Sequence, residues 1–376
     1  MDFNTTDEQT MLRDTVSRYL ADTYSFDNRM KTVHGGAGWN PAVWKAFAEE
    51  LGILGAPFSE AHGGLGGGAV ENMIVMEEIG RALVIEPYLP TVVIAGGALK
   101  AAGGALADAV IPEIIAGNAI IAFAYAEPQG RYNLADLRTT AKKDGAGYVL
   151  NGHKSVVYSA PYATHLLVTV RSGGSQRDKD GVSLFLIPAD TKGVTRRDYP
   201  TVDGSAASEV YFENVAVGAE HMIGGEGAAL PLIEQIVDEG TAAICAEACG
   251  VTRVLHATTL DYAKQRKQFG KAIGDFQVIQ HRLVDMFMEV EQSVSITLMA
   301  TLKLDTPERA QAVSAAKAKV GKGAKFVGQN AVQIHGGIGI SNELAVGHYF
   351  KRSTMIEGQF GSVDHHMGRY ERIVIG

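Results

Sequence analysis

The sequence predicts an α+β protein built as a helical N-terminal domain, a middle β domain and a C-terminal helical bundle. Three observations predict this order. Apolar residues recur at helical spacing up to about residue 120, short runs rich in β-branched and aromatic residues fill residues 121–226, and long helical patterns return over residues 227–376. We therefore expect domains at 1–120, 121–226 and 227–376, the middle one a small β-barrel or sandwich and the last a bundle of about four helices.

The N-terminal segment is typical of amphipathic helices. In "DEQTMLRDTVSRYLAD", Met11, Val16 and Tyr19 share a stripe with Leu12 and Leu20, and the threonines before it suit a helix cap. "AVWKAFAEELGILG" and "AVENMIVMEEIGRAL" repeat this spacing. The intervening "SEAHGGLGGG" follows no predicted strand and precedes no Lys-Ser or Lys-Thr pair, so we interpret it as an interhelical loop and not as a phosphate-binding motif.

The middle segment predicts several short strands. They are separated by turn sequences such as "KKDGAG", and Val, Ile, Tyr and Phe favour a pleated, half-buried surface. The predicted strands are "AIIAFAYAE", "GYVLNGHKSVVYS", "HLLVTVRS", "VSLFLIPA" and "SEVYFENVAV".

The C-terminal segment predicts helices longer than the usual three or so turns. They are "LPLIEQIVDEGTAAICAEACGVTRVLHATTLDYAKQR", "FQVIQHRLVDMFMEVEQSVSITLMATLKL" and "ERAQAVSAAKAKVGKGAKFVGQNAVQIHG". The first contains the chain's 2 cysteines, Cys245 and Cys249. Their spacing of four places them on one helical face, where we expect a buried apolar pair and not a metal or redox site.

Charge and composition exclude several classes of function. The formal net charge is −8 at pH 7, so no basic excess favours nucleic acid or an anionic membrane. The most apolar run, "AVIPEIIAGNAIIAFAYA", carries Pro112, Glu113 and Asn118 and is a poor membrane span. The N-terminal "MDFNTTDEQT" is acidic and polar, unlike a signal peptide. We expect a cytoplasmic protein without membrane insertion and without a metal site.

Four motifs fall in one order along the chain. They are "AYAEPQGRYNLADLRTTA", "LNGHKSVVYSAPYATHLLV", "YAKQRKQFGKAIGDFQVIQHRL" and "AVQIHGGIGISNE". Each lies in the predicted strand or helix context in which the acyl-CoA dehydrogenase family carries a similar motif. Together they resemble that family over essentially the whole chain.

The resemblance implies a cofactor, a reaction and partners. It implies FAD held between the β domain and the C-terminal helices, in a tetramer whose flavins are each shared by two subunits. It implies oxidation of an acyl-CoA to the trans-2-enoyl-CoA, as in β-oxidation of fatty acids, with electrons passing to an electron-transfer flavoprotein. The set "AEACG…RKQFG…FQVIQHR…MIEGQFGS" is most similar to small subunits of heteromeric dehydrogenases for pimeloyl-CoA.

The motifs also assign residues to the cofactor, by resemblance. The strand after Lys154 would lie along the isoalloxazine, although Val156 replaces the family's tryptophan and Tyr158 its threonine near the flavin N5. Tyr125 and Ala126 would face the pyrimidine edge. Arg266 would reach the pyrophosphate of a neighbouring subunit's flavin, where a guanidinium fork suits a phosphate. The remaining predicted cofactor residues are Phe269, Gln277, Gln280, Gln333, Gly336, Gly337 and Gly339.

The predicted thioester side departs from the family pattern. Arg131 and Tyr132 stand where the family has Gly-Ser, whose serine contacts the CoA arm. Arg131 could bind a phosphate, bind a substrate carboxylate or face water, so we hypothesise an unusual acyl group such as a dicarboxylic or polycyclic one. Asp238 has a family counterpart that touches substrate.

The expected catalytic base is missing. Removing the acyl Cα proton needs a carboxylate within hydrogen-bond reach, in a dry site that raises its pKa. Counting from "QIHGGIG" and from "RKQF", the two family positions for this glutamate fall on Phe360 and Gly240. Glu239 is the best substitute, although one residue turns a helix by about 100°. Glu247 and Glu357 are weaker candidates, and Asp364, His365 and His366 suit a polar helix start.

Four functional hypotheses follow. The chain pairs with a homologous subunit that supplies the glutamate, as in family heterotetramers for sterol side chains and dicarboxylic acyl groups, and we favour this one. Alternatively it is a self-sufficient dehydrogenase that uses Glu239, an O₂-using flavoenzyme on the same fold, or a non-catalytic binding subunit.

Overall fold

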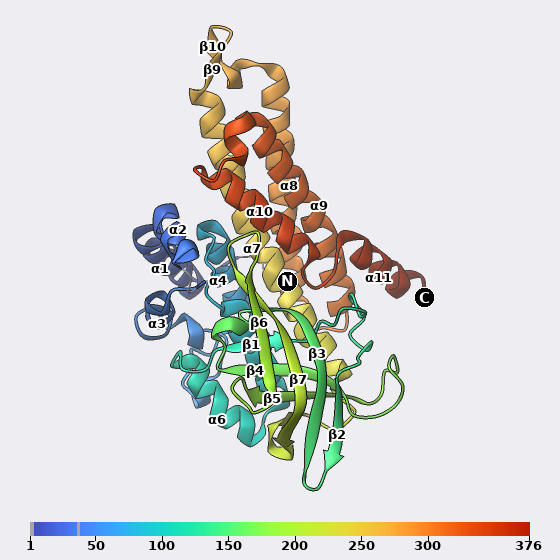
Figure 1. Ribbon diagram of the computed structural model, residues 1–376. Coiled ribbons are helices and arrows are strands. Elements are labelled where there is room, and N and C mark those ends of the chain that lie inside the picture. The colour runs from blue at the N-terminus through green and yellow to red at the C-terminus, as the bar shows by residue number, and fades with distance from the viewer. Residues whose placement is uncertain (1–3, 36–37) are drawn as a thin grey trace. The chain divides into compact units, whose positions relative to one another are not determined.

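The computed structural model describes residues 4–35 and 38–376 (Figure 1). These residues form two compact units. The first unit contains the residues up to His34, Ala69–Val84 and Thr241–Gly376, and the second contains Gly35–Gly68 and Ile85–Gly240. The boundaries that we predict near residues 120 and 226 remain predictions.

The first unit is built from helices. Its elements are α1 Asp7–Thr23, α2 Phe26–His34, α4 Ala69–Ala82, α7 Leu230–Gln265 (which begins in the second unit), β9 Lys267–Gln268, β10 Lys271–Ala272, η6 Ile273–Asp275, α8 Gln277–Leu302, α9 Arg309–His335, η7 Gly336–Ile340, α10 Ala345–Gly358 and α11 Val363–Ile375. The three long helices predicted beyond residue 227 are thus confirmed as α7, α8 and α9. The expected threonine cap is also present, because Thr6 and Gln9 form a capping box at the start of α1.

Small residues let the helices of the first unit approach closely. A Cβ on Gly80 of α4 would overlap the Glu247 carbonyl of α7, and one on Gly250 of α7 would overlap the Glu77 carbonyl of α4. Glycine is therefore required at both positions, since the two backbones touch. A cluster of small core side chains in this unit contains Ala242, Ala300, Ala312, Val313 and Ala316.

The second unit surrounds a mixed sheet. Its elements are α3 Pro41–Glu49, η1 Ile53–Gly55, η2 Glu60–His62, η3 Leu89–Ala95, α5 Gly96–Ala102, α6 Gly104–Ile115, β1 Ile121–Ala124, β2 Thr140–Asp144, β3 Gly147–Tyr158, η4 Ala160–Tyr162, β4 His165–Arg171, β5 Val182–Pro188, β6 Val194–Pro200, β7 Ala206–Gly218, η5 Ala219–His221 and β8 Met222–Ile223. The strand order is β6-β7-β3-β2-β4-β5-β8, with β1 paired in parallel to β4.

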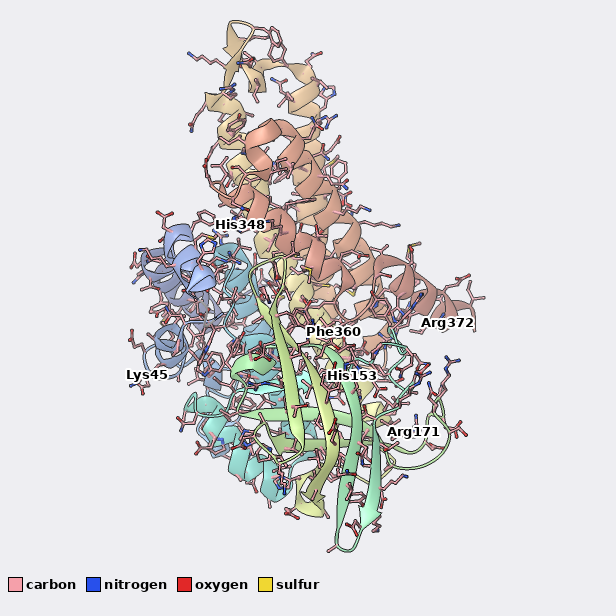
Figure 2. The ribbon with its side chains drawn as sticks, in the orientation of Figure 1. Lys45, His153, Arg171, His348, Phe360 and Arg372 are labelled. Atoms are coloured by element: carbon pink, nitrogen blue, oxygen red, sulfur yellow. The ribbon has the colours of Figure 1, made fainter. Side chains whose placement is uncertain are left out.

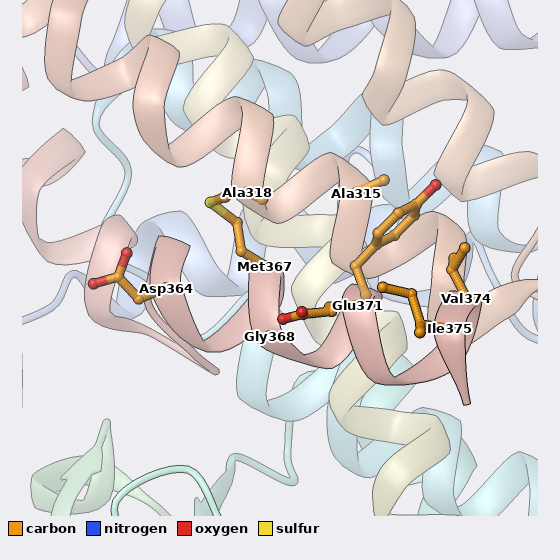
Figure 3. Close-up of a pocket in the computed structure, with 9 residues that line it drawn as sticks. Ala315, Ala318, Asp364, Met367, Gly368, Glu371, Val374 and Ile375 are labelled. Atoms are coloured by element: carbon orange, nitrogen blue, oxygen red, sulfur yellow. The ribbon is translucent and has the colours of Figure 1, made fainter.

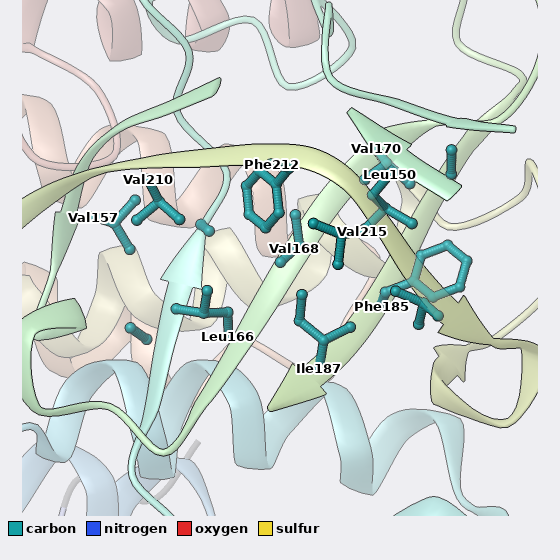
Figure 4. Packing of buried hydrophobic residues seen from close by; sticks show 14 of the residues in the cluster. Leu150, Val157, Leu166, Val168, Val170, Phe185, Ile187, Val210, Phe212 and Val215 are labelled. Atoms are coloured by element: carbon teal, nitrogen blue, oxygen red, sulfur yellow. The ribbon is translucent and has the colours of Figure 1, made fainter. Parts of the chain in front are cut away.

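Alternate residues of these strands form one apolar core (Figure 4). Leu150, Val168, Phe185, Val210 and Phe212 are all buried in it. The five strands predicted from apolar runs are present as β1, β3, β4, β5 and β7. The sequence did not predict β2, β6 or β8, because "TAKKD" and "VTRRDYP" are polar and β8 has only two residues.

A buried ion pair lies at one side of this core. The Lys154 ammonium is 2.7 Å from a Glu127 carboxylate oxygen, and both side chains are almost fully buried. Lys154 also donates to Thr169, while Glu127 accepts from the backbone N–H groups of Arg138 and Thr139. Burial lowers the pKa of Lys154 to about 8. Burial alone would raise the pKa of Glu127, but the ammonium and the hydrogen bonds hold that pKa below its ordinary value.

The structure also tests the expectations for the cysteines and for membrane spans. Cys245 and Cys249 are free and buried in α7. Among the described residues, no helix is both long enough and apolar enough to span a membrane.

Replacing Lys154 by methionine should destabilise the protein strongly. The variant leaves the Glu127 carboxylate buried without its cation, which costs about 4 kcal/mol. Urea unfolding followed by circular dichroism measures the loss. Lys143→Met on the adjacent strand is the matched control, because Lys143 is 67% exposed and its loss should cost less than about 1 kcal/mol. Equal losses in the two variants would contradict the importance of the buried pair.

Candidate active site

A bulged strand in the second unit carries residues assigned to the flavin ring. β3 breaks its register with β7 at this point. Val156, in the bulge, has a left-handed φ of 51° and is 43% exposed despite being apolar. The Ser155 N–H donates to the Ala126 carbonyl oxygen over 2.9 Å. The structure therefore brings Tyr125 and Ala126 beside the strand that contains Val156 and Tyr158.

A polar cluster on the exposed side of β3, β6 and β7 escaped the sequence analysis. His153 Nε2 lies 2.6 Å from one carboxylate oxygen of Glu209, and the other oxygen accepts from the Tyr199 hydroxyl over 3.0 Å. The His153 ring (labelled in Figure 2) stacks on Tyr211 at 4.4 Å. Burial and the Glu209 carboxylate raise the pKa of Tyr199 to about 12. Only the pairing of three strands brings these residues together, so no sequence spacing could reveal them.

Arg131 and Tyr132 lie in a turn between β1 and β2 that backbone hydrogen bonds hold, here called the tied turn. The Gly130 N–H donates to the Glu127 carbonyl, and the Asn133 N–H donates to the Gly130 carbonyl. Arg131 is exposed and has a left-handed φ of 47°. Glycine adopts this φ without cost and arginine does not, which explains the glycine of the family pattern.

The start of α7 holds the second position considered for the base. Gly240 and Asp238 are buried. Glu239 is half-buried, and one of its carboxylate oxygens accepts from Gln235 over 2.9 Å. The other oxygen faces Gly97 of α5, 2.6 Å from where a Cβ of that glycine would lie. The Glu239 carboxylate is therefore packed against a helix.

The first unit carries the residues assigned to the pyrophosphate end. Arg266 precedes the short β9–β10 hairpin and is exposed, and Phe269 at the hairpin tip is 93% exposed with a left-handed φ of 52°. Gln277 and Gln280 begin α8 and are also exposed. The Gln280 amide donates to the Gly274 carbonyl over 2.9 Å. An exposed phenylalanine beside an exposed guanidinium is a surface that a ligand or a second chain would cover.

The predicted adenosine end follows α9 in the same unit. Gln333 is exposed in the last turn of α9, and Gly336, Gly337 and Gly339 form η7. A Cβ on Gly337 would meet nothing within 4 Å. The internal packing of the chain does not require glycine there, and glycine would let the backbone of this segment approach a ligand closely.

The first position considered for the base lies between α10 and α11. Phe360 (labelled in Figure 2) is half-buried and has a left-handed φ of 56°. Glu357 accepts from the Val363 N–H over 3.0 Å, so its carboxylate caps α11. Asp364 lies exposed in the first turn of α11, as expected for a polar helix start. That expectation is wrong for His366, which is 1% exposed.

Glu247, another candidate base, is committed elsewhere. Its carboxylate forms a two-pronged ion pair with Arg352 of α10, with N–O distances of 2.5 and 2.7 Å. Because Glu247 is buried in this pair, it is an interhelical charge and not a free proton acceptor.

A cavity of about 650 Å³ opens between α9 and α11 (Figure 3). It is lined mainly by apolar side chains. The acidic residues Asp364 and Glu371 also line it. None of the predicted cofactor, substrate or base residues lines it.

Comparison with known proteins decides the family. Profiles of the acyl-CoA dehydrogenase N-terminal, middle and C-terminal domains match residues 6–118, 122–215 and 219–372. The chain belongs to the acyl-CoA dehydrogenase family. A probable acyl-CoA dehydrogenase of Bacillus subtilis (strain 168), YngJ, is 29% identical over 364 residues, which cover 95% of each chain.

Similar solved structures agree with the fold. A variant of the Tcur3481-Tcur3483 steroid ACAD has a TM-score of 0.89 and 27% identity, covering 98% of each chain. The FAD complex of PigA has a TM-score of 0.92 and 25% identity, covering 100% of this chain and 99% of that one. This acyl-CoA dehydrogenase is therefore an FAD flavoprotein with an N-terminal helical part, a central mixed sheet and a C-terminal helical part.

The residues present fit FAD. Val156 and Phe269 expose apolar side chains at the predicted flavin surfaces, and Gly337 leaves open space where a Cβ would lie.

His366 should make stability depend on pH. Burial lowers its pKa to about 3, whereas an unfolded histidine titrates near 6.5. Between these values the unfolded chain binds a proton that the folded chain does not, so stability falls as the pH is lowered. From pH 7 to pH 4 the wild type should lose about 3 kcal/mol more than His366→Gln. Urea unfolding at both pH values measures this difference, and parallel losses would contradict it.

Proposed function

We propose that this acyl-CoA dehydrogenase desaturates an acyl-CoA thioester together with a homologous subunit that supplies the catalytic glutamate. One observation carries the proposal: the flavin-binding motifs are kept, while both family positions for the base hold residues that cannot accept a proton, Phe360 and Gly240. The similarity to a steroid ACAD named for two chains, Tcur3481 and Tcur3483, supports a heteromer.

The chain's own residues would bind and orient in this reaction. Bound FAD supplies the hydride acceptor. Arg266, Phe269 and the Gln333–Gly339 segment would hold its phosphate and adenosine parts in an adjoining subunit, and the bulged strand at Val156 and Tyr158 would bind its ring. A carboxylate from the partner chain takes the Cα proton, and an electron-transfer flavoprotein takes the electrons.

Arg131 and Asp238 would contact the substrate. Arg131 is held at the tip of a tied turn in a conformation that costs free energy for a non-glycine residue. A guanidinium fork so placed suits a carboxylate or phosphate. This geometry supports an acyl-CoA that carries an additional anionic group, such as a dicarboxylic acyl group.

The alternative with Glu239 as the base has weaker support. A proton acceptor needs a free carboxylate oxygen facing the substrate. Glu239 binds Gln235 with one oxygen and faces α5 with the other.

Bleaching of the bound flavin tests the proposed division of labour. The FAD-loaded chain alone, mixed anaerobically with octanoyl-CoA, glutaryl-CoA or pimeloyl-CoA, should be reduced at least roughly 100-fold more slowly than its complex with a homologous chain that carries the glutamate, because general-base catalysis is lost. Absorbance at the flavin band measures both rates. Fast bleaching by the lone wild type that Glu239→Gln abolishes would instead establish Glu239 as the base.

FAD affinity tests the cofactor site separately. Arg266→Ala should weaken FAD binding roughly 10- to 100-fold, since a charge-assisted hydrogen bond to phosphate contributes about 1.5–3 kcal/mol. Lys264→Ala is the control, because Lys264 is also exposed near the end of α7 and is not among the residues assigned to the cofactor. Fluorescence titration of apoprotein with FAD measures both, and equal affinities in the two variants would remove Arg266 from the site.

A further inference from the structure

The turn between α10 and α11 has a conformation that needs support. Phe360 has φ 56° and Gly361 has φ 127°, so two successive residues lie in the left-handed half of backbone space. Glycine tolerates this and phenylalanine does not. Other groups must therefore hold the turn in place.

A buried lysine of α9 binds the turn on both sides of Phe360. The Lys317 ammonium donates to the Glu357 carbonyl over 2.8 Å and to the Gly361 carbonyl over 2.7 Å. Lys317 is 1% exposed, and burial lowers its pKa to about 8. One turn farther along α9, a Cβ on Gly321 would lie 2.7 Å from a methyl of Val363, so the turn rests directly on this helix.

A buried histidine binds the carbonyl of Phe360 itself. His366 Nε2 lies 3.1 Å from that oxygen, and because a carbonyl only accepts, Nε2 carries the proton. His366 Nδ1 is buried without a hydrogen-bond partner, which fits a neutral ring. A Cβ on Gly361 would lie 2.5 Å from Nε2, so the ring covers the turn. Lys317 thus binds the carbonyls of residues 357 and 361, and His366 binds the carbonyl of residue 360.

We propose that Lys317 and His366 are positioning residues that fix the backbone of position 360. The turn could therefore hold a proton-abstracting side chain at this position, although Phe360 occupies it in this chain. The inference rests on the proposed function in one respect, that position 360 faces the acyl group. A glutamate introduced there would take the Cα proton onto its carboxylate as hydride leaves Cβ for the oxidised flavin and the C=C bond forms.

The first arm of the test examines the support without catalysis. 4-Fluorophenylalanine placed at position 360 of the FAD-loaded protein reports its environment by ¹⁹F NMR. We expect one narrow signal in the wild type and in Lys319→Met, and broadened or multiple signals in Lys317→Met. Lys319 is the matched control, because it lies two residues away on α9 and pairs with Glu289 instead of the turn. A single unchanged signal in a folded Lys317→Met protein would overturn the proposal.

The second arm examines the function of position 360. Phe360→Glu should let the lone FAD-loaded chain bleach with acyl-CoA, and adding Lys317→Met should lower that rate roughly 100-fold, as expected for a misplaced base. KM should change little, because substrate contacts remain. If the ¹⁹F signals change in Lys317→Met but Phe360→Glu is inactive, the role of Lys317 in holding the turn is confirmed. Position 360 as the base site is then refuted. An unchanged rate on adding Lys317→Met would overturn the positioning role.

A second pair of variants covers the case in which Lys317→Met does not fold. His366→Gln keeps a donor for the Phe360 carbonyl and His366→Leu removes it. The ¹⁹F signal should stay narrow in His366→Gln and broaden in His366→Leu, and identical spectra would overturn the role of His366.

Discussion

The buried ion pair between Lys154 and Glu127 is the interaction on which the second unit's candidate site depends. It joins the middle of β3 to the segment after β1, and Glu127 then accepts from the backbone of residues 138 and 139 where β2 begins. Val156 in the bulge follows Lys154 by two residues, and Arg131 in the tied turn follows Glu127 by four residues. Because both ions are out of water, moving either one leaves an uncompensated buried charge, so the pair holds the irregular backbone in place.

In the first unit a different buried cation, Lys317, holds an irregular backbone segment in place. Lys317 binds two backbone carbonyls instead of a carboxylate, which leaves a positive charge dispersed over the turn at Phe360. The nearby His366 can balance no charge while neutral, and its low pKa follows from burial and from the neighbouring ammonium. In both units a buried lysine is the residue that orders a non-repetitive segment.

The sequence was sufficient for the order of the long helices and the apolar strands, while the motif-based site residues remain predictions. Periodicity predicted α7, α8, α9 and the five apolar strands, because each buries a continuous apolar stripe. Periodicity did not predict β6. This edge strand exposes Arg196 and Arg197, so its sequence lacks the apolar alternation of a half-buried strand. Periodicity also failed for Lys317, His366 and the His153–Glu209 pair, whose partners lie 40, 6 and 56 residues away along the chain and meet only through tertiary packing.

The replacement at position 360 is informative because of what surrounds it. Burying an ammonium costs several kcal/mol before its hydrogen bonds offset that cost, and a left-handed phenylalanine adds about 1 kcal/mol more. A chain with no use for this turn could relax it by placing glycine at 360 and a neutral residue at 317. The structure instead keeps the strained residue, the buried cation and the neutral histidine together. A rigid apolar side chain held at this point suits a wall against which an acyl group is oriented while the proton leaves to a carboxylate of another chain.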